Sequence, residues 1–123
     1  MVTGWEDKMN IREELGKRML FFDGGLGSLL QARGLKPGEL PETWNLSKPE
    51  ELLAIHKEYL EAGADIILAN TFGANRFKYD HLQEIVEAAV KNAKKAAEEC
   101  GRNAYVALDL GPTGKLLKPM GTL

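Results

Sequence analysis

Three short polar segments that contain glycine, and that could bind a small molecule, each follow an apolar run of the chain. The first holds Asp23, Gly24 and Gly25; the second holds Asn70, Thr71, Phe72 and Gly73; the third begins at Asp109 and continues through Gly111, Pro112 and Thr113. Glycine lets the backbone approach a ligand closely, and a carboxylate at the end of a buried strand is costly unless a partner pairs with it. The pattern indicates a small-molecule site with acids and amides as its fixed polar groups.

The residue pattern alone leaves more than one use open for these side chains. Asp23 either faces a substrate or caps a tight turn. Asn70 and Thr71 either line the site or bond the backbone of their own turn, which is the commoner use of such residues in loops. Asp109 is either a pocket residue or a structural acid with a backbone or cationic partner.

Familiar catalytic and cofactor motifs are not found in the chain. A dinucleotide fingerprint at Gly25-x-Gly27 would need a third glycine where the chain has Leu30, and no strand with a terminal acid follows at the expected spacing. Metal-ligand spacings, a nucleophile elbow and a P-loop are absent from the sequence. We therefore assign no catalytic residue and no metal ligand to this chain.

Glycine and proline divide the chain into elements that would position the three segments. The apolar residues within 18–23 show no alternation, which predicts a strand covered on both faces. A short helix over residues 28–33 follows, and then residues 35–47 form a loop with two prolines. Ser47 and Glu50 have the spacing of a capping box, which predicts a helix that begins there and ends at Gly63.

The second half of the chain repeats this alternation. Residues 66–69 form an uninterrupted apolar run that predicts a second buried strand, and residues 104–110 predict a third. Between them Asp80 is expected to cap a long amphipathic helix that ends at Gly101. The order β, α, β, α, β predicts an α/β fold with a parallel sheet. Because ligands bind at the carboxyl ends of parallel strands, the three polar segments should lie together.

Composition excludes several classes of protein. Sixteen basic and eighteen acidic residues give a net charge of −2, with no basic stripe, so nucleic acid is not expected as a partner. The apolar runs are too short to span a bilayer, and the N-terminus has no signal-peptide core. The single cysteine, Cys100, permits no internal disulfide. We expect a cytoplasmic protein with no membrane contact.

Three side chains that often do chemistry are given structural roles. His56 lies on the apolar stripe of its helix and is predicted to be a packed, hydrogen-bonded histidine. His81 is expected to be exposed, and Cys100 to lie in the core at the end of the long helix.

Taken together, the segments LFFDGGLGSLLQARGL, GADIILANTFGANRFK and ALDLGPTGKLLKPMGTL resemble the start of the homocysteine S-methyltransferase family. The resemblance is strongest to the homocysteine-binding module of its cobalamin-dependent methionine synthase branch, and it runs from about Arg18 to the last residue. It implies a (β/α)8 barrel and methyl transfer to the thiol of homocysteine, as in methionine biosynthesis. It also implies zinc bound to the substrate sulfur, with cobalamin and methyltetrahydrofolate used elsewhere in the parent protein.

The resemblance assigns substrate-binding roles to eight residues. Asp23 corresponds to the acid that binds the amino group of homocysteine, and Gly24 and Gly25 give the substrate room against the backbone. Asn70, Thr71, Phe72 and Gly73 match a loop that lines the same pocket, and Asp109 matches a position near the barrel mouth. The zinc cysteines of the family lie in later strands, and Cys100 matches none of them.

Length sets the expected extent of the domain. A complete barrel needs about 250 residues, so residues 1–123 are expected to form one incomplete domain, with residues 1–17 as an N-terminal extension or helix. We expect such an N-terminal fragment to be inactive alone, to need the rest of the barrel and the donor and cobalamin modules, and to self-associate through its apolar edges. The alternatives are a small self-contained α/β binding or interaction module, and another barrel enzyme with Asp23 and Asp109 as acid and base.

Overall fold

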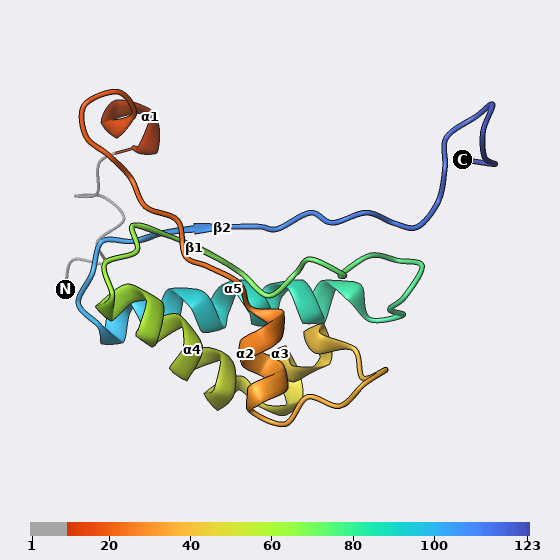
Figure 1. The fold of residues 1–123 in the computed structure, drawn as a ribbon, viewed down its shortest axis with the longest axis horizontal. Helices are drawn as coiled ribbons and strands as arrows, with labels where there is room; N and C mark the ends of the chain where they lie inside the picture. The colour runs from red at the N-terminus through yellow and green to blue at the C-terminus, as the bar shows by residue number, and fades with distance from the viewer. Residues whose placement is uncertain (1–9) are drawn as a thin grey trace.

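A computed structural model describes residues 10–123 (Figure 1). Its sheet pairs β1 (Ile66–Leu68) with β2 (Tyr105–Ala107) in parallel, with Ile67 opposite Val106. Phe22 adds one parallel bridge to Ile66, on the segment that precedes both strands in the chain. The predicted α/β fold with parallel strands is confirmed, and neighbours in the sequence are neighbours in space.

The predicted first strand is wrong in both its extent and its burial. Within residues 18–23 only Phe22 makes a ladder bridge, and Met19, Phe21 and Phe22 are 73%, 56% and 60% exposed. The amide of Phe21 donates to the side chain of Asp65 (3.0 Å), so this end of the segment bonds a carboxylate where a longer ladder would continue. The segment is apolar, but within residues 10–123 its side chains are not covered on both faces.

Two helices pack on one side of the strands (Figure 1): α4 (Pro49–Glu61) and α5 (Leu82–Glu99). Both end where predicted, because Gly63 and Gly101 adopt φ values of 110° and 66° that favour glycine. Among residues 10–123, no helix has both the length and the apolar composition of a membrane span.

The predicted helix starts are wrong in detail, and the predicted loop is partly helical. After α2 (Gly27–Ala32), residues 35–47 include the 3₁₀ helix η1 (Pro41–Thr43) and α3 (Trp44–Ser47). Ser47 therefore ends a helix, and its hydroxyl donates to the Thr43 carbonyl (3.2 Å), which leaves Lys48 as the N-cap of α4. The N-cap of α5 is His81, without a side-chain cap, so Asp80 does not cap this helix.

Two apolar clusters hold the helices to the strands and to each other. The cluster between α4, β1 and α5 contains Leu60, Ala64, Ile67, Ala93, Ala96, Ala97 and Ala104, with Cys100 and Val106 packed against it. The cluster between α2, α3 and α4 contains Leu30, Leu35, Trp44, Leu52 and Ile55. Tyr59 packs against both clusters. Alanines on α5 bring α4 close, so the helices form one layer under the sheet.

His56 is packed as predicted but is not hydrogen-bonded. Its side chain is 1% exposed, and neither ring nitrogen has a partner among the described residues. Burial lowers the pKa of His56 from 6.5 to about 4, so the ring is neutral at physiological pH. His81 is exposed as expected, and Cys100 is half-buried at the end of α5.

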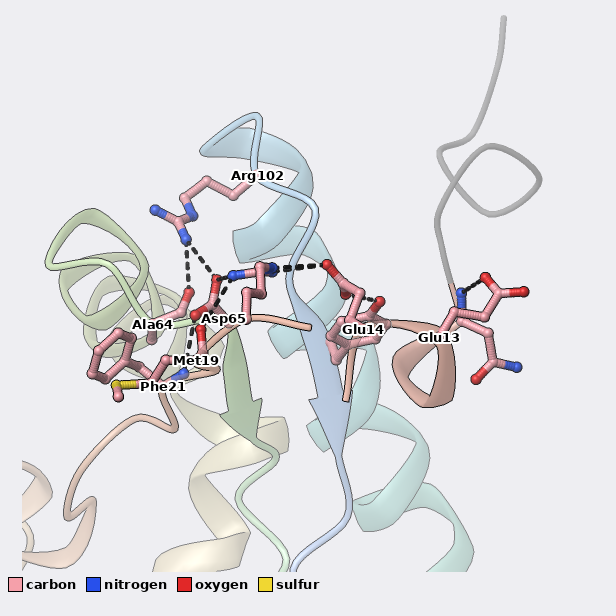
Figure 2. A network of polar contacts seen from close by, with 10 residues as sticks. Glu13, Glu14, Met19, Phe21, Ala64, Asp65 and Arg102 are labelled. Atoms are coloured by element: carbon pink, nitrogen blue, oxygen red, sulfur yellow. Dashed lines mark hydrogen bonds and ion pairs between the residues drawn. The ribbon is translucent and has the colours of Figure 1, made fainter. Parts of the chain in front are cut away.

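A polar network closes the amino ends of the strands (Figure 2). Asp65, just before β1, accepts hydrogen bonds from the Phe21 amide and from Arg18 (3.2 Å), and Arg102 lies 3.6 Å from it. The first of these bonds, together with the charges of both arginines, lowers the pKa of Asp65. Arg18 also pairs with Glu14 of α1 (Ile11–Glu14) at 2.9 Å. The network thus connects α1, which lies within the predicted N-terminal extension of residues 1–17, to the sheet. Residues 1–9 of that extension lie outside the described part of the chain.

Candidate functional site

The carboxylate of Asp23 lies across the end of the neighbouring strand. The Asp23 amide donates to the Ile66 carbonyl (2.9 Å), directly after the bridge at Phe22, and this fixes the residue at the sheet edge. Its Oδ2 accepts the amide of Leu68 at 3.1 Å. Its Oδ1 is buried and has no hydrogen-bond partner among residues 10–123. One oxygen therefore serves the fold, and the other is an unused acceptor.

Thr71 and Asp109 join the ends of β1 and β2. The Thr71 hydroxyl donates to the Asp109 carbonyl (2.9 Å) and accepts the Asp109 amide (3.0 Å). The two predicted segments thus meet at the carboxyl ends of the strands, and Asp23 meets them through Leu68. We call Asp23, Thr71 and Asp109 the strand-end site.

Burial and like charge set the electrostatics of this site. Burial raises the pKa of Asp23 against the effect of the Leu68 hydrogen bond, and the nearby negative charge of Asp109 raises it further. The ion pairs of the described chain include neither acid. Two carboxyl groups without a cation favour a positively charged ligand.

The two glycines after Asp23 have different surroundings. A Cβ on Gly24 would lie 2.9 Å from the Tyr59 hydroxyl and 3.2 Å from its ring, so Tyr59 of α4 requires a glycine there. Tyr59 also donates to the Gly25 carbonyl at 2.6 Å, which holds the turn. A Cβ on Gly25 would meet only Ser28, at 3.8 Å, so space is left beside this residue. Tyr59 is 34 residues from Gly25 in the chain, so the sequence alone gives no sign of these contacts.

Asn70 faces the helices. Its side-chain amide donates to the Pro41 carbonyl (3.0 Å), and its carbonyl accepts from Asn45 (2.9 Å). The side chain is 4% exposed. The structure therefore does not bring this amide together with the carboxylates of the strand-end site.

Phe72 and Gly73 form the loop after β1. The Phe72 ring is 58% exposed, and its carbonyl accepts the Gly111 amide at 3.1 Å. Gly73 is buried, and its amide donates to Oε1 of Glu42 at 2.5 Å. Glu42 was not among the predicted site residues; it lies directly after Pro41 in the predicted loop of residues 35–47. The glycine at position 73 is the one signal of a close neighbour.

The free acceptor of the strand-end site matches the donor chemistry of a primary ammonium group. Such a group is a charged donor of three hydrogen bonds, and Oδ1 of Asp23 is a buried acceptor without a partner. A hydrogen bond to an ionised acceptor is about twice as strong as a neutral one. The arrangement suits the amino end of an amino acid.

The described residues do not fit a zinc ion. No group of three or more His, Cys, Asp or Glu side chains that could hold a metal is found in residues 10–123. Cys100 lies at the end of α5, which precedes the amino end of β2. Zinc would need ligands from beyond these residues.

An α/β domain with parallel strands and a polar site at their carboxyl ends is the class of protein that these observations define. The family model for homocysteine S-methyltransferase matches residues 20–122, and this chain belongs to that family. The chain is also 31% identical over 122 residues to the methionine synthase of Mycobacterium tuberculosis (strain ATCC 25618 / H37Rv), an alignment that covers 87% of this chain.

Solved structures share the fold. The homocysteine methyltransferase MmuM from Escherichia coli matches in its metallated form with a TM-score of 0.69 at 23% identity over 85% of this chain. Its apo form matches with a TM-score of 0.66 at 25% identity over 88% of this chain. The chain spans 42% and 43% of those two solved chains, and 10% of the length of the methionine synthase.

Proposed function

We propose that this chain forms the N-terminal part of a homocysteine-binding (β/α)8 barrel and binds the amino group of homocysteine through Asp23. The observation that carries the proposal is the buried, unpartnered Oδ1 of Asp23 at the carboxyl end of a parallel strand. Membership of the homocysteine S-methyltransferase family supports this substrate over the acid/base alternative.

Each part of the site has a role in this proposal. Asp23 holds the ammonium group, and the open space at Gly25 receives the backbone of the amino acid. Asp109 adds negative potential beside it, and the exposed ring of Phe72 contacts the aliphatic carbons of the ligand. Thr71 fixes the spacing between the two strand ends.

The activity proposed for the whole protein is transfer of a methyl group to the thiol of homocysteine, which gives methionine. Likeness to a methionine synthase supports this product. In this proposal, zinc, cobalamin and methyltetrahydrofolate are bound by other parts of the whole protein. Because the described residues lack a metal-ligand set, we propose that the chain alone binds substrate and does not transfer the methyl group.

Calorimetric titration tests the proposed binding. Homocysteine is titrated into the 123-residue chain and into Asp23→Asn, with γ-mercaptobutyrate as an analogue that lacks the amino group. We expect wild type to prefer homocysteine, and Asp23→Asn to lose about tenfold or more in affinity for homocysteine while its affinity for the analogue is unchanged. Asp80→Asn removes an exposed carboxylate at the start of α5 and is the matched control.

Two outcomes of this titration would count against the proposal. Equal affinity of wild type and Asp23→Asn for homocysteine would remove Asp23 from the site. Binding by the wild-type chain that requires added zinc would show that metal ligands arise within it, contrary to the lack of a metal-ligand set in residues 10–123.

A further inference from the structure

Glu42 is a buried acid outside the strand-end site. Its side chain lies in η1 and is 4% exposed, and no ion pair with it is found within residues 10–123. Two donors compensate for its burial: the Gly73 amide at 2.5 Å on Oε1 and the Tyr79 hydroxyl at 2.7 Å on Oε2. Burial raises the pKa of Tyr79, and its hydrogen bond to Glu42 raises it further, so Tyr79 remains a donor. Burying a carboxylate is costly, and apolar packing alone does not require one here.

The loop that Glu42 holds is the one that carries Phe72. A Cβ at position 73 would lie 2.8 Å from Oε1 of Glu42, so Gly73 and Glu42 fit each other closely. On the other side, the Phe72 carbonyl accepts the Gly111 amide, where an added Cβ would lie 2.2 Å from that oxygen. Thr71 is bonded to the main chain of Asp109. The backbone on both sides of Phe72 is therefore fixed while its ring remains exposed.

These contacts connect Glu42 to the strand-end site. The loop of residues 71–73 follows two residues after the end of β1, and β1 supplies the Leu68 amide that holds Asp23. The bonds of Thr71 and Phe72 lead to the segment after β2, whereas the bond of Gly73 leads to η1. Loss of the Glu42 contact would release the loop on the helix side only, and the Phe72 ring would no longer be held in a fixed position.

We propose that Glu42 is a positioning residue for amino-acid binding: its carboxylate fixes the loop of residues 71–73 so that Phe72 contacts the aliphatic part of the ligand. The inference rests on the proposed function, because it takes homocysteine as the ligand. Glu42 touches no ligand in this scheme and acts through Gly73.

A double-mutant cycle separates positioning from general stabilisation. The variants are Glu42→Ala, Glu42→Gln, Phe72→Ala and the double variant Glu42→Ala/Phe72→Ala, each titrated with homocysteine. We expect Glu42→Ala to lower affinity about tenfold, since hydrogen bonds to a charged group are lost. Glu42→Gln keeps an acceptor for Gly73 and should stay near wild type. Phe72→Ala should add little once Glu42 is gone, because both changes remove the same contact.

A matched control lies in the helix cluster. Leu52→Ala destabilises the cluster between α2, α3 and α4 without touching residues 71–73, so it should lower Tm and leave homocysteine affinity unchanged where the chain is folded. The positioning role is overturned if Glu42→Ala binds like wild type, or if its effect simply adds to that of Phe72→Ala.

Amide hydrogen exchange gives a readout that needs no ligand. We expect Glu42→Ala to speed exchange at Gly73 about tenfold or more, with the core amides of α4 and α5 unchanged; unchanged exchange at Gly73 overturns the inference. If wild type shows no homocysteine binding, the proposed function fails, and faster exchange confined to residues 71–73 still supports control of the loop by Glu42. Tyr79→Phe should raise exchange less than Glu42→Ala, because it removes one donor and keeps the acceptor of Gly73.

Discussion

Asp23 and Leu68 are joined by one hydrogen bond that uses half of a carboxylate. The Leu68 amide donates to Oδ2 of Asp23 at 3.1 Å, and Oδ1 has no partner within residues 10–123. This bond has two effects. It connects the segment of residues 18–23 to the end of β1, and it fixes the orientation of the free Oδ1. Because one oxygen of Asp23 serves the fold and the other is free, a single substitution of Asp23 can change ligand binding and chain stability in opposite directions.

Asp23→Asn is expected to stabilise the chain at neutral pH. The folded pKa of Asp23 lies above its ordinary value of 3.8, so the folded chain binds more protons and stability falls as pH rises through that window. Asparagine carries no charge to bury and can still accept the Leu68 amide. Thermal unfolding between pH 3 and 8 should therefore give a higher Tm for Asp23→Asn at pH 7, with the difference closing below pH 3.8. A lower Tm for the variant at pH 7 would contradict the cost of burial.

Gly24→Ala should destabilise the chain through Tyr59. The added methyl would lie 2.9 Å from the Tyr59 hydroxyl, and overpacking of this kind costs about 1–3 kcal/mol. Tyr59→Phe removes that oxygen, so the double variant should lose less than the sum of the two single changes, by about 1 kcal/mol. Urea unfolding of the four proteins measures this coupling. Gly25→Ala is the control, since its methyl would meet only ordinary contacts; strictly additive losses would count against the clash.

The sequence predicts the alternation of helices and strands because periodicity and glycine stops are local signals. The apolar stripe of α4 and the left-handed glycine at position 63 lie within a few residues of each other, and both are observed. The strand at residues 18–23 was misjudged because burial depends on what covers a face. An apolar run indicates that other elements should pack on both faces of the strand. It does not show whether the described residues supply those elements.

Helix starts failed for a different reason. The pair Ser47 and Glu50 satisfies the capping pattern, yet Ser47 is already the last residue of α3. A local motif competes here with a preceding helical turn that Trp44 anchors in the core at 0% exposure. The prolines at positions 37 and 41 suggested a loop throughout, although proline is also suited to the first turn of a helix, where Pro41 is found.

The order of the strands predicts which residues meet at the strand-end site. Asp23, Thr71 and Asp109 come together because parallel strands end at one edge. The contacts that shape the site and the neighbouring loop join residues 31 to 45 positions apart, as in Gly73 with Glu42 and Asp23 with Leu68. Such distant pairs leave no periodic signal in one sequence, so these contacts had to come from the structure.

Asp65 is expected to control how the N-terminal segment joins the sheet. Asp65→Asn keeps the shape of the side chain and removes the charge that pairs with Arg18 and Arg102. The folded pKa of Asp65 is lowered, so its contribution is present above pH 3.8 and is lost as pH falls below that value. We expect Asp65→Asn to have a lower Tm at pH 7 and a weaker dependence on salt. Faster amide exchange at Phe21 would show that the hydrogen bond between Phe21 and Asp65 is weakened. An unchanged Tm would show that the network does not contribute to stability.

Self-association is expected through the exposed apolar side chains near Phe22 and on the segment after β2. Phe22, Leu110 and Leu117 are 60%, 86% and 70% exposed, and exposed apolar side chains promote contact between molecules. Sedimentation velocity should show oligomers that weaken in Leu110→Lys. Leu46→Lys on α3, where the native side chain is 46% exposed, is the control and should leave the distribution unchanged. A monodisperse monomer at all concentrations would argue against self-association through these side chains.

The buried ring of His56 should make the chain sensitive to acid. Its pKa is about 4 in the folded chain against 6.5 ordinarily, so the unfolded chain binds more protons between these values. Stability is then fully present above pH 6.5 and falls as pH drops toward 4, by about 3 kcal/mol in total, since one pKa unit is worth about 1.4 kcal/mol. His56→Leu removes two ring nitrogens that lack partners within residues 10–123 and should flatten this part of the profile. Urea unfolding at intervals across the range measures the slope. The same substitution at the exposed His81 is the control. If the dependence of stability on pH stays equally steep in His56→Leu, other groups cause the acid sensitivity.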